Sequence, residues 1–154
     1  MKKILISFFL VLFALITIQC SNESSGKINV QKDFDYVYDT MQKVYDVVLK
    51  HIKNPDPGLN IAEKYVNDRQ QELEAIGKRL NSIILTQKES IIIGKFTERY
   101  TNLHNKHVDV LEKNLNAEQR RRFVTIVAQN IALKVLSQLK MPGSSTEFFK
   151  KLFR

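Results

Sequence analysis

The spacing of apolar residues is the feature that most restricts the fold of this 154-residue chain. From residue 33 onward they recur every three or four positions, as in Phe34, Val37, Met41, Val44 and Val48. This spacing places them on one side of an α-helix. A half-buried strand needs sustained alternation of apolar and polar residues, and no stretch has it. The sequence therefore predicts an all-α domain.

Start and stop signals divide this region into four long helices. The first is expected over residues 33–53, because Asn54-Pro55-Asp56-Pro57-Gly58 follows it and proline disrupts helices. The others are expected to begin at Asn60, Thr86 and Asn116, each of which precedes a Glu or Gln by three residues, as in a capping box. Leu59 is placed for a hydrophobic staple at the second start. Since neither Gly nor Pro lies near residue 85, a helix continuing through it is the alternative to a break there.

Short connections make successive helices reverse direction, so we expect an antiparallel four-helix bundle. The third helix is expected to bury a stripe that runs from Ile92 to Val110. The fourth helix, residues 117–140, has the widest apolar arc and is expected to be the most buried. A short C-terminal helix is expected after Pro142-Gly143-Ser144.

The N-terminal segment has the three-part layout of a secretory signal. Lys2 and Lys3 precede an uncharged apolar run from Ile4 to Ile18, and Cys20, the single cysteine of the chain, follows it. The run is shorter than the roughly 20 apolar residues that a membrane-spanning helix needs. We therefore expect cleavage near Cys20. A single cysteine also excludes an intrachain disulfide.

Residues 1 to about 25 resemble a bacterial lipoprotein precursor, in which the cysteine after the apolar run is diacylated on sulfur and becomes the mature N-terminus. The segment Thr17-Ile18-Gln19-Cys20 departs from the usual Leu-small-small-Cys box and is similar to the relaxed boxes of spirochaete lipoproteins. The resemblance implies lipidation of Cys20 and attachment to the inner or outer membrane of the cell envelope, facing the periplasm or the cell surface. The alternative is a secreted protein or an uncleaved anchor in which Cys20 carries no lipid.

The chain is then expected to have four parts. They are a signal peptide at 1–19, a lipidated cysteine and flexible tether at 20–32, the helical bundle at 33–141 and a basic amphipathic tail at 142–154. Without Lys2 and Lys3 the mature chain has 22 basic and 16 acidic residues. Its excess of positive charge lies in the C-terminal third, which is therefore where we expect anionic partners to bind.

Arg120, Arg121 and Arg122 lie in the first turns of the fourth helix, where the positive end of the helix dipole opposes their charge. Acidic residues nearby in the sequence, such as Glu112 or Glu118, would offset that cost locally. Otherwise the arginines contact an anionic partner, either lipid headgroups or a protein client.

The tail combines cations with an aromatic face, a pattern that suits an interfacial membrane helix or a partner groove. The cations are Lys150 and Lys151, and the apolar contact residues are Phe148, Phe149, Leu152 and Phe153. The alternative is a fifth short helix docked on the bundle. Nucleic acid is not expected as a partner, because no aromatic platform or reading motif accompanies the basic residues. The oligomeric state is left open.

His104 and His107 are spaced i, i+3 and are the candidates for a shared metal. Two ligands fall short of the three or four that a useful site needs, and the alternative is a partly buried, hydrogen-bonded histidine. The sequence has no Gly-rich phosphate loop and no nucleophile-elbow serine. We therefore expect neither enzymatic activity nor a cofactor.

A second resemblance concerns Leu115-Asn116-Ala117-Glu118-Gln119 and the residues up to Phe123. The segment is similar to the Leu-Thr-x-x-Gln motif of the Spy and CpxP family of periplasmic stress proteins, with Asn116 in place of Thr. Leu59-Asn60-Ile61-Ala62-Glu63 stands where a distant first copy is expected, with Glu in place of Gln. The resemblance implies an ATP-independent chaperone or envelope-stress role.

The leading hypothesis is a membrane-anchored envelope lipoprotein with a non-enzymatic helical binding domain. The alternatives are the chaperone and a histidine-based metal-binding protein.

Overall fold

The computed structural model describes residues 29–82 and 86–136, of which 89% are helical and none lies in a strand. The all-α prediction is confirmed. None of the helices in these ranges is both long enough and apolar enough to cross a bilayer. The segments in chain order are α2 (Val30–Lys50), α3 (Pro55–Asn67), α4 (Gln70–Asn81), α5 (Gln87–Asn114), α6 (Ala117–Val124), the π-helix η1 (Thr125–Leu133) and α7 (Lys134–Leu136).

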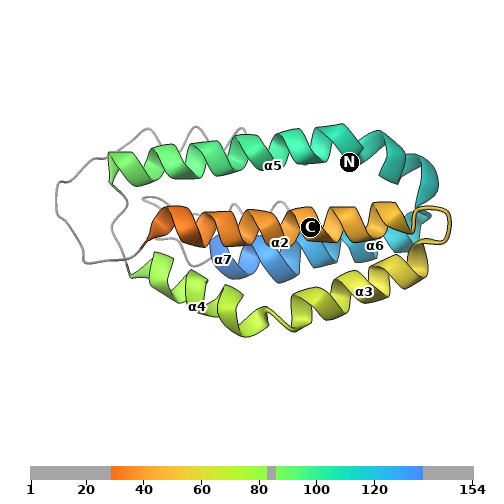
Figure 1. The fold of residues 1–154 in the computed structure, drawn as a ribbon, viewed down its shortest axis with the longest axis horizontal. Helices are drawn as coiled ribbons and strands as arrows, with labels where there is room; N and C mark the ends of the chain where they lie inside the picture. The colour runs from red at the N-terminus through yellow and green to blue at the C-terminus, as the bar shows by residue number, and fades with distance from the viewer. Residues whose placement is uncertain (1–28, 83–85, 137–154) are drawn as a thin grey trace.

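Helix α2 lies at the centre of these helices and contacts α3, α4, α5 and η1 (Figure 1). Helix α5 runs beside α2 in the same direction, whereas α3 and α4 run back along the other side of α2. Rings of α2 and α5 meet at Phe34 and Phe96, whose centroids are 5.0 Å apart. The predicted α2 stripe is buried: Phe34, Val37, Met41, Val44 and Val48 are each at most 1% exposed. Burial of this stripe places α3, α4, α5 and η1 around α2.

Helix α2 begins three residues before the predicted start. Asn29 caps it, because the Asn29 Oδ1 accepts a hydrogen bond of 3.0 Å from the Lys32 backbone N–H. The buried Asp33 lies in the first turn and accepts two hydrogen bonds from the Arg79 guanidinium of α4, at 2.7 and 3.2 Å. This ion pair joins the start of α2 to the end of α4.

The predicted loop at residues 54–58 is wrong, because α3 already begins at Pro55. Proline fits the first turn of a helix, where its missing N–H would have no partner. Gly58 lies within α3 at its closest approach to α2. A Cβ on Gly58 would lie 2.9 Å from the His51 Cβ and 3.2 Å from the Val47 carbonyl oxygen. Glycine therefore serves here to bring the two backbones together.

The second predicted helix is divided in two at Asp68 and Arg69, which appears as the bend between α3 and α4 in Figure 1. In a continuous helix the Tyr65 carbonyl would accept from the Arg69 backbone N–H. Here the Arg69 N–H bonds to the Val66 oxygen at 3.0 Å, and the Arg69 guanidinium donates to the Tyr65 oxygen at 3.1 Å. The guanidinium also lies 3.6 Å from the centre of the Tyr65 ring. The side chain of Arg69 thus takes the place of its own backbone.

The expected starts at Thr86 and Asn116 are both confirmed as complete capping boxes. On α5 the buried stripe includes Phe96, Tyr100 and Leu103 as predicted, but Val110 is exposed. The fourth predicted helix is not uniformly α-helical, since residues 125–133 form a π-helix. The proposed capping box at Asn60 is also wrong, because Asn60 lies inside α3.

We predict that Gly58→Val lowers the free energy of unfolding by about 2 kcal/mol, because the added side chain would force α2 and α3 apart. Lys64→Val places the same residue at an exposed position of α3 and should change stability by less than about 0.5 kcal/mol. Urea denaturation of both variants measures the difference. Equal stabilities would show that the close contact at Gly58 is not needed.

Candidate functional site

The arginine run lies at the start of α6, directly after a tight turn. The Asn116 Oδ1 accepts from the Gln119 N–H at 2.9 Å, and the Gln119 Oε1 accepts from the Asn116 N–H at 3.0 Å. The remaining amide group of Gln119 donates to the Asp56 carboxylate of α3 at 3.0 Å. Gln119 thus starts the helix and also joins it to α3.

Arg122 is bound to α3 by its whole guanidinium group. Its Nε and Nη2 donate to the two oxygens of Glu63, each at 3.0 Å, and Nη2 also donates to the Asn60 Oδ1 at 2.7 Å. The Asp56 carboxylate lies 3.7 Å from Nη1. These bonds to Glu63 raise the pKa of Arg122. A two-pronged pair of this kind fixes geometry as well as charge.

Arg120 is used in a different way. Its Nη1 donates to the Leu115 carbonyl at 2.7 Å and to the Glu112 carbonyl at 3.1 Å. These are carbonyls at the C-terminal end of α5, where a cation is favourable. The Arg121 side chain is exposed and forms neither a hydrogen bond nor an ion pair within residues 29–82 and 86–136. The three arginines are therefore divided, with two engaged in packing and Arg121 exposed to solvent.

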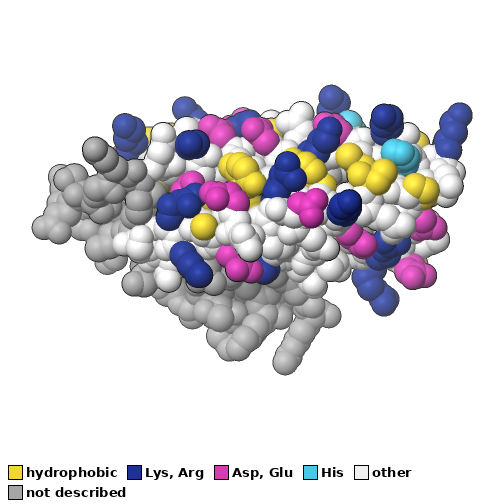
Figure 2. Space-filling model, turned by 60° about the horizontal axis from the view of Figure 1, so that its bottom comes forward, with side chains coloured by type: hydrophobic (Ala, Val, Ile, Leu, Met, Phe, Trp, Pro, Cys, Tyr) yellow, Lys and Arg dark blue, Asp and Glu magenta, His cyan; other side chains and the backbone are white. Residues whose placement is uncertain are grey.

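The carboxylates that contact Arg122 directly, Glu63 and Asp56, belong to α3, and the nearby Glu118 adds favourable charge. Sequence reasoning assigned Asn60 and Glu63 to a helix start, so it missed them as partners of Arg122. No local pattern signals a contact across 59 residues of chain. Figure 2 shows basic and acidic side chains interspersed over one face of the body, with hydrophobic side chains in a row between them. Charge on this face is thus mixed and not of a single sign.

A second cluster lies between α2 and α5 and is built around Tyr45. The Tyr45 side chain is fully buried, and its hydroxyl lies 2.9 Å from the His104 Nδ1. The hydroxyl is also hydrogen-bonded to Tyr100, and the Phe123 ring packs edge-on against Tyr45 with centroids 4.9 Å apart. Burial raises the pKa of Tyr45, and it raises the pKa of Tyr100 to about 12. Both hydroxyls therefore stay protonated at neutral pH.

His104 is only partly satisfied by this network. Its Nε2 is buried and has no hydrogen-bond partner in the part of the chain that the structure describes. Burial lowers the pKa of His104, and it also lowers the pKa of His107, whose ring centroid lies 6.1 Å from that of Tyr45. Which of the Tyr45 hydroxyl and the His104 Nδ1 donates their hydrogen bond is set by the tautomer of the neutral imidazole. The partly buried, hydrogen-bonded alternative thus describes the geometry of His104.

A shared metal finds little support in this arrangement. Within the described residues, no group of three or more His, Cys, Asp or Glu side chains is close enough to hold a metal ion. One nitrogen of His104 already faces Tyr45. His104 and His107 therefore remain two neighbouring imidazoles without a third ligand in this part of the chain.

The other predicted site residues lie outside the described residues. They are the lipidation residue Cys20, the cations Lys150 and Lys151, and the apolar residues Phe148, Phe149, Leu152 and Phe153.

The chain matches no protein family model, no curated protein and no solved structure. Its function is therefore argued from its own residues.

We predict that Arg122→Gln lowers the free energy of unfolding by about 1 kcal/mol, since it leaves Glu63 and Asn60 without their partner. Arg121→Gln removes the same charge from an exposed side chain that has no hydrogen bond or ion pair in the described ranges, and it should leave stability within about 0.5 kcal/mol of the parent. Chemical denaturation of the two matched variants is the measurement. Equal losses would contradict the structural role of Arg122.

We predict that the free energy of unfolding falls as the pH drops below 6.5, the ordinary pKa of histidine. Because burial lowers the pKa of His104 and His107 in the folded state, the unfolded chain binds more protons in this range, and stability rises with pH. Urea denaturation at pH 7.5 and pH 5 measures the slope. His104→Gln should make the slope shallower. An unchanged slope in this variant would exclude His104 as a source.

Proposed function

We propose that this protein is a membrane-anchored lipoprotein of the cell envelope, whose helical domain acts by binding a partner and not by catalysis. The observation that carries the proposal is the position of Cys20, the single cysteine, directly after the apolar run from Ile4 to Ile18. Removal of residues 1–19 and diacylation of Cys20 would attach the domain to the inner or outer membrane. Each buried methylene of the lipid contributes about 0.8 kcal/mol, so two chains hold a protein firmly.

The body of this lipoprotein is proposed to be an antiparallel four-helix bundle with a short C-terminal helix. Successive rods run in opposite directions when α3 is counted with α4, and α6 with η1 and α7, which supports this arrangement (Figure 1). Side-by-side contact of the parallel helices α2 and α5 is its unusual feature. Such a body offers the faces of its helices to a partner.

The proposed partner is an anionic lipid surface or an acidic protein client. Of the three arginines, Arg121 is free to contact it, because Arg120 and Arg122 already bind other groups of the domain. The tail supplies further cations at Lys150 and Lys151 and apolar contacts at Phe148 and Phe149. Arg121→Glu is therefore the clean probe of anion binding, because reversing Arg122 would also disturb packing.

A chaperone of the Spy and CpxP type is the second candidate. The specific observation in its favour is that the two segments carrying that resemblance touch, since Arg122 binds Asn60 and Glu63. The Asn116–Gln119 capping box weighs against it, because a helix start alone accounts for the motif. Suppression of the aggregation of an unfolded protein at sub-stoichiometric amounts would separate a chaperone from a simple binding domain.

We predict that the native protein begins at Cys20 and carries the added mass of acyl chains there. Mass spectrometry of the purified protein tests lipidation and cleavage together. Cys20→Ser should abolish the lipid mass, whereas Ser21→Ala, the matched change one residue away, should keep it. A native protein that retains Met1, or that has a bare thiol at position 20, would overturn the proposal.

A further inference from the structure

We propose that the bundle is oriented on the membrane, with the end where α2 and α5 begin against the bilayer and with Lys32, Lys78 and Lys88 in contact with anionic headgroups. We call this end the tether end. The inference deepens the proposed function and rests on it, because it takes Cys20 as the anchor. It leaves Arg121, which lies at the opposite end at the start of α6, to contact the acidic protein client and not the bilayer.

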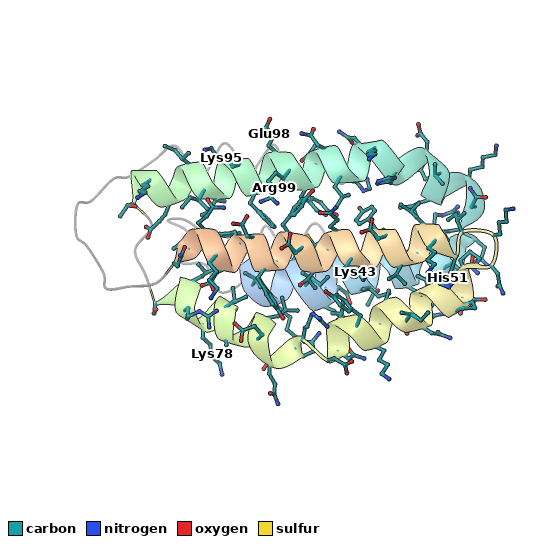
Figure 3. All side chains as sticks on the ribbon, in the orientation of Figure 1. Lys43, His51, Lys78, Lys95, Glu98 and Arg99 are labelled. Carbon is teal, nitrogen blue, oxygen red and sulfur yellow. The ribbon has the colours of Figure 1, made fainter. Side chains whose placement is uncertain are left out.

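Three helix ends meet at the tether end. Residues 29–31 of α2 and residues 86, 88, 89 and 92 of α5 line one cavity of about 560 Å³. The ion pair of Asp33 with Arg79 brings the last turn of α4 to the same place. Lys32 lies in the first turn of α2, Lys88 in that of α5 and Lys78 in the last turn of α4. Figure 3 shows Lys78 pointing away from the body.

The carboxylates of the tether end are already engaged. Asp33 binds Arg79, Asp35 binds Arg99 and Gln31, and Glu89 accepts from the Thr86 backbone N–H at 2.7 Å. Figure 3 shows Arg99 between α5 and α2. The positive ends of α2 and α5 also lie here, because the two helices run in parallel. Negative charge at this end is therefore compensated from within the domain.

The side chains of the three lysines of the tether end, Lys32, Lys78 and Lys88, are exposed and form no hydrogen bond or ion pair within residues 29–82 and 86–136. Lys78 lies near the Glu74 carboxylate, which is already paired with Lys134. The opposite end of the domain has lysines as well, but it also exposes the carboxylates Asp46 and Glu118. A phosphate-rich surface would meet three exposed lysines and carboxylates that are already hydrogen-bonded at the tether end, and mixed charge at the other.

The length of the tether favours the same orientation. Eight residues separate Cys20 from Asn29, so nine Cα-to-Cα steps join them, and nine extended steps span at most about 30 Å. Helix α2 has 21 residues and is thus about 31 Å long. For the opposite end to reach the bilayer, the tether would have to lie fully extended along the whole domain. The tether end, by contrast, can lie against the bilayer without full extension of the residues between Cys20 and Asn29.

The test is acetylation of lysines in the purified native protein, reconstituted into vesicles of neutral phosphatidylcholine or of phosphatidylcholine with phosphatidylglycerol. Vesicles are floated first, so that only bound protein is labelled, and each lysine is quantified by mass spectrometry. Lys50, Lys53 and Lys113 are controls in the same molecule, since they lie near the opposite ends of α2 and α5. Each lysine near an anionic membrane surface raises the affinity of a protein for that surface about fivefold. We expect Lys32, Lys78 and Lys88 to react at least about fivefold more slowly in anionic than in neutral vesicles, with unchanged controls.

The outcomes separate the two proposals. Protein that fails to float with neutral vesicles contradicts the lipid anchor itself. The orientation is wrong, but the anchor is not, if the protein floats and the three tether-end lysines react as fast as the controls. The same conclusion follows if the controls are protected instead. Loss of the protection at about 1 M salt, where screening acts over roughly 3 Å, is expected for a contact of this kind. Protection that persists at that salt concentration would mean that headgroup charge is not its cause.

Discussion

Burial of the α2 stripe is the constraint on which the rest of the described structure depends. Helix α2 is the element that contacts α3, α4, α5 and η1, and residues such as Val37, Val44 and Val48 have no exposed surface at all. Truncating one of these buried side chains would leave a cavity between α2 and the helices that the side chain contacts. Polar bonds then fix which neighbour lies where: Asp33 holds α4, and Tyr45 joins His104 of α5.

Local patterns in the sequence predicted the helices well at positions where a single signal, such as a capping box or the apolar spacing, applies. The capping boxes at Thr86 and Asn116 are pairs of residues three apart, so they can be recognised without knowing the fold. The all-α class follows from apolar spacing in the same way. The errors fall at positions where a second rule competes. Pro55 reads as a stop signal for one helix, but it is equally a good first residue of the next.

Long-range partners could not be predicted, and these decide the candidate site. Glu63 resembles a cap residue in the sequence, but in the folded chain it binds Arg122 from another helix. The bend at Arg69 depends on a side chain that competes with its own backbone for the Tyr65 carbonyl, which no spacing rule describes. A run of three arginines therefore divides into two packing residues and one surface cation. The division rests on packing between helices, which one sequence does not reveal.

The π-helix η1 sets the rotation of α7, the last helix that the structure describes. Each π-helical turn closes over one more residue than an α-helical turn, so η1 rotates everything after it relative to an uninterrupted helix. As a result Lys134 meets Glu74 of α4, and Val135 is fully buried. Deleting one residue from η1 would rotate α7 about the helix axis, so that different side chains would face α4. The wide turn thus acts as a spacer that decides which face of α7 packs against α4.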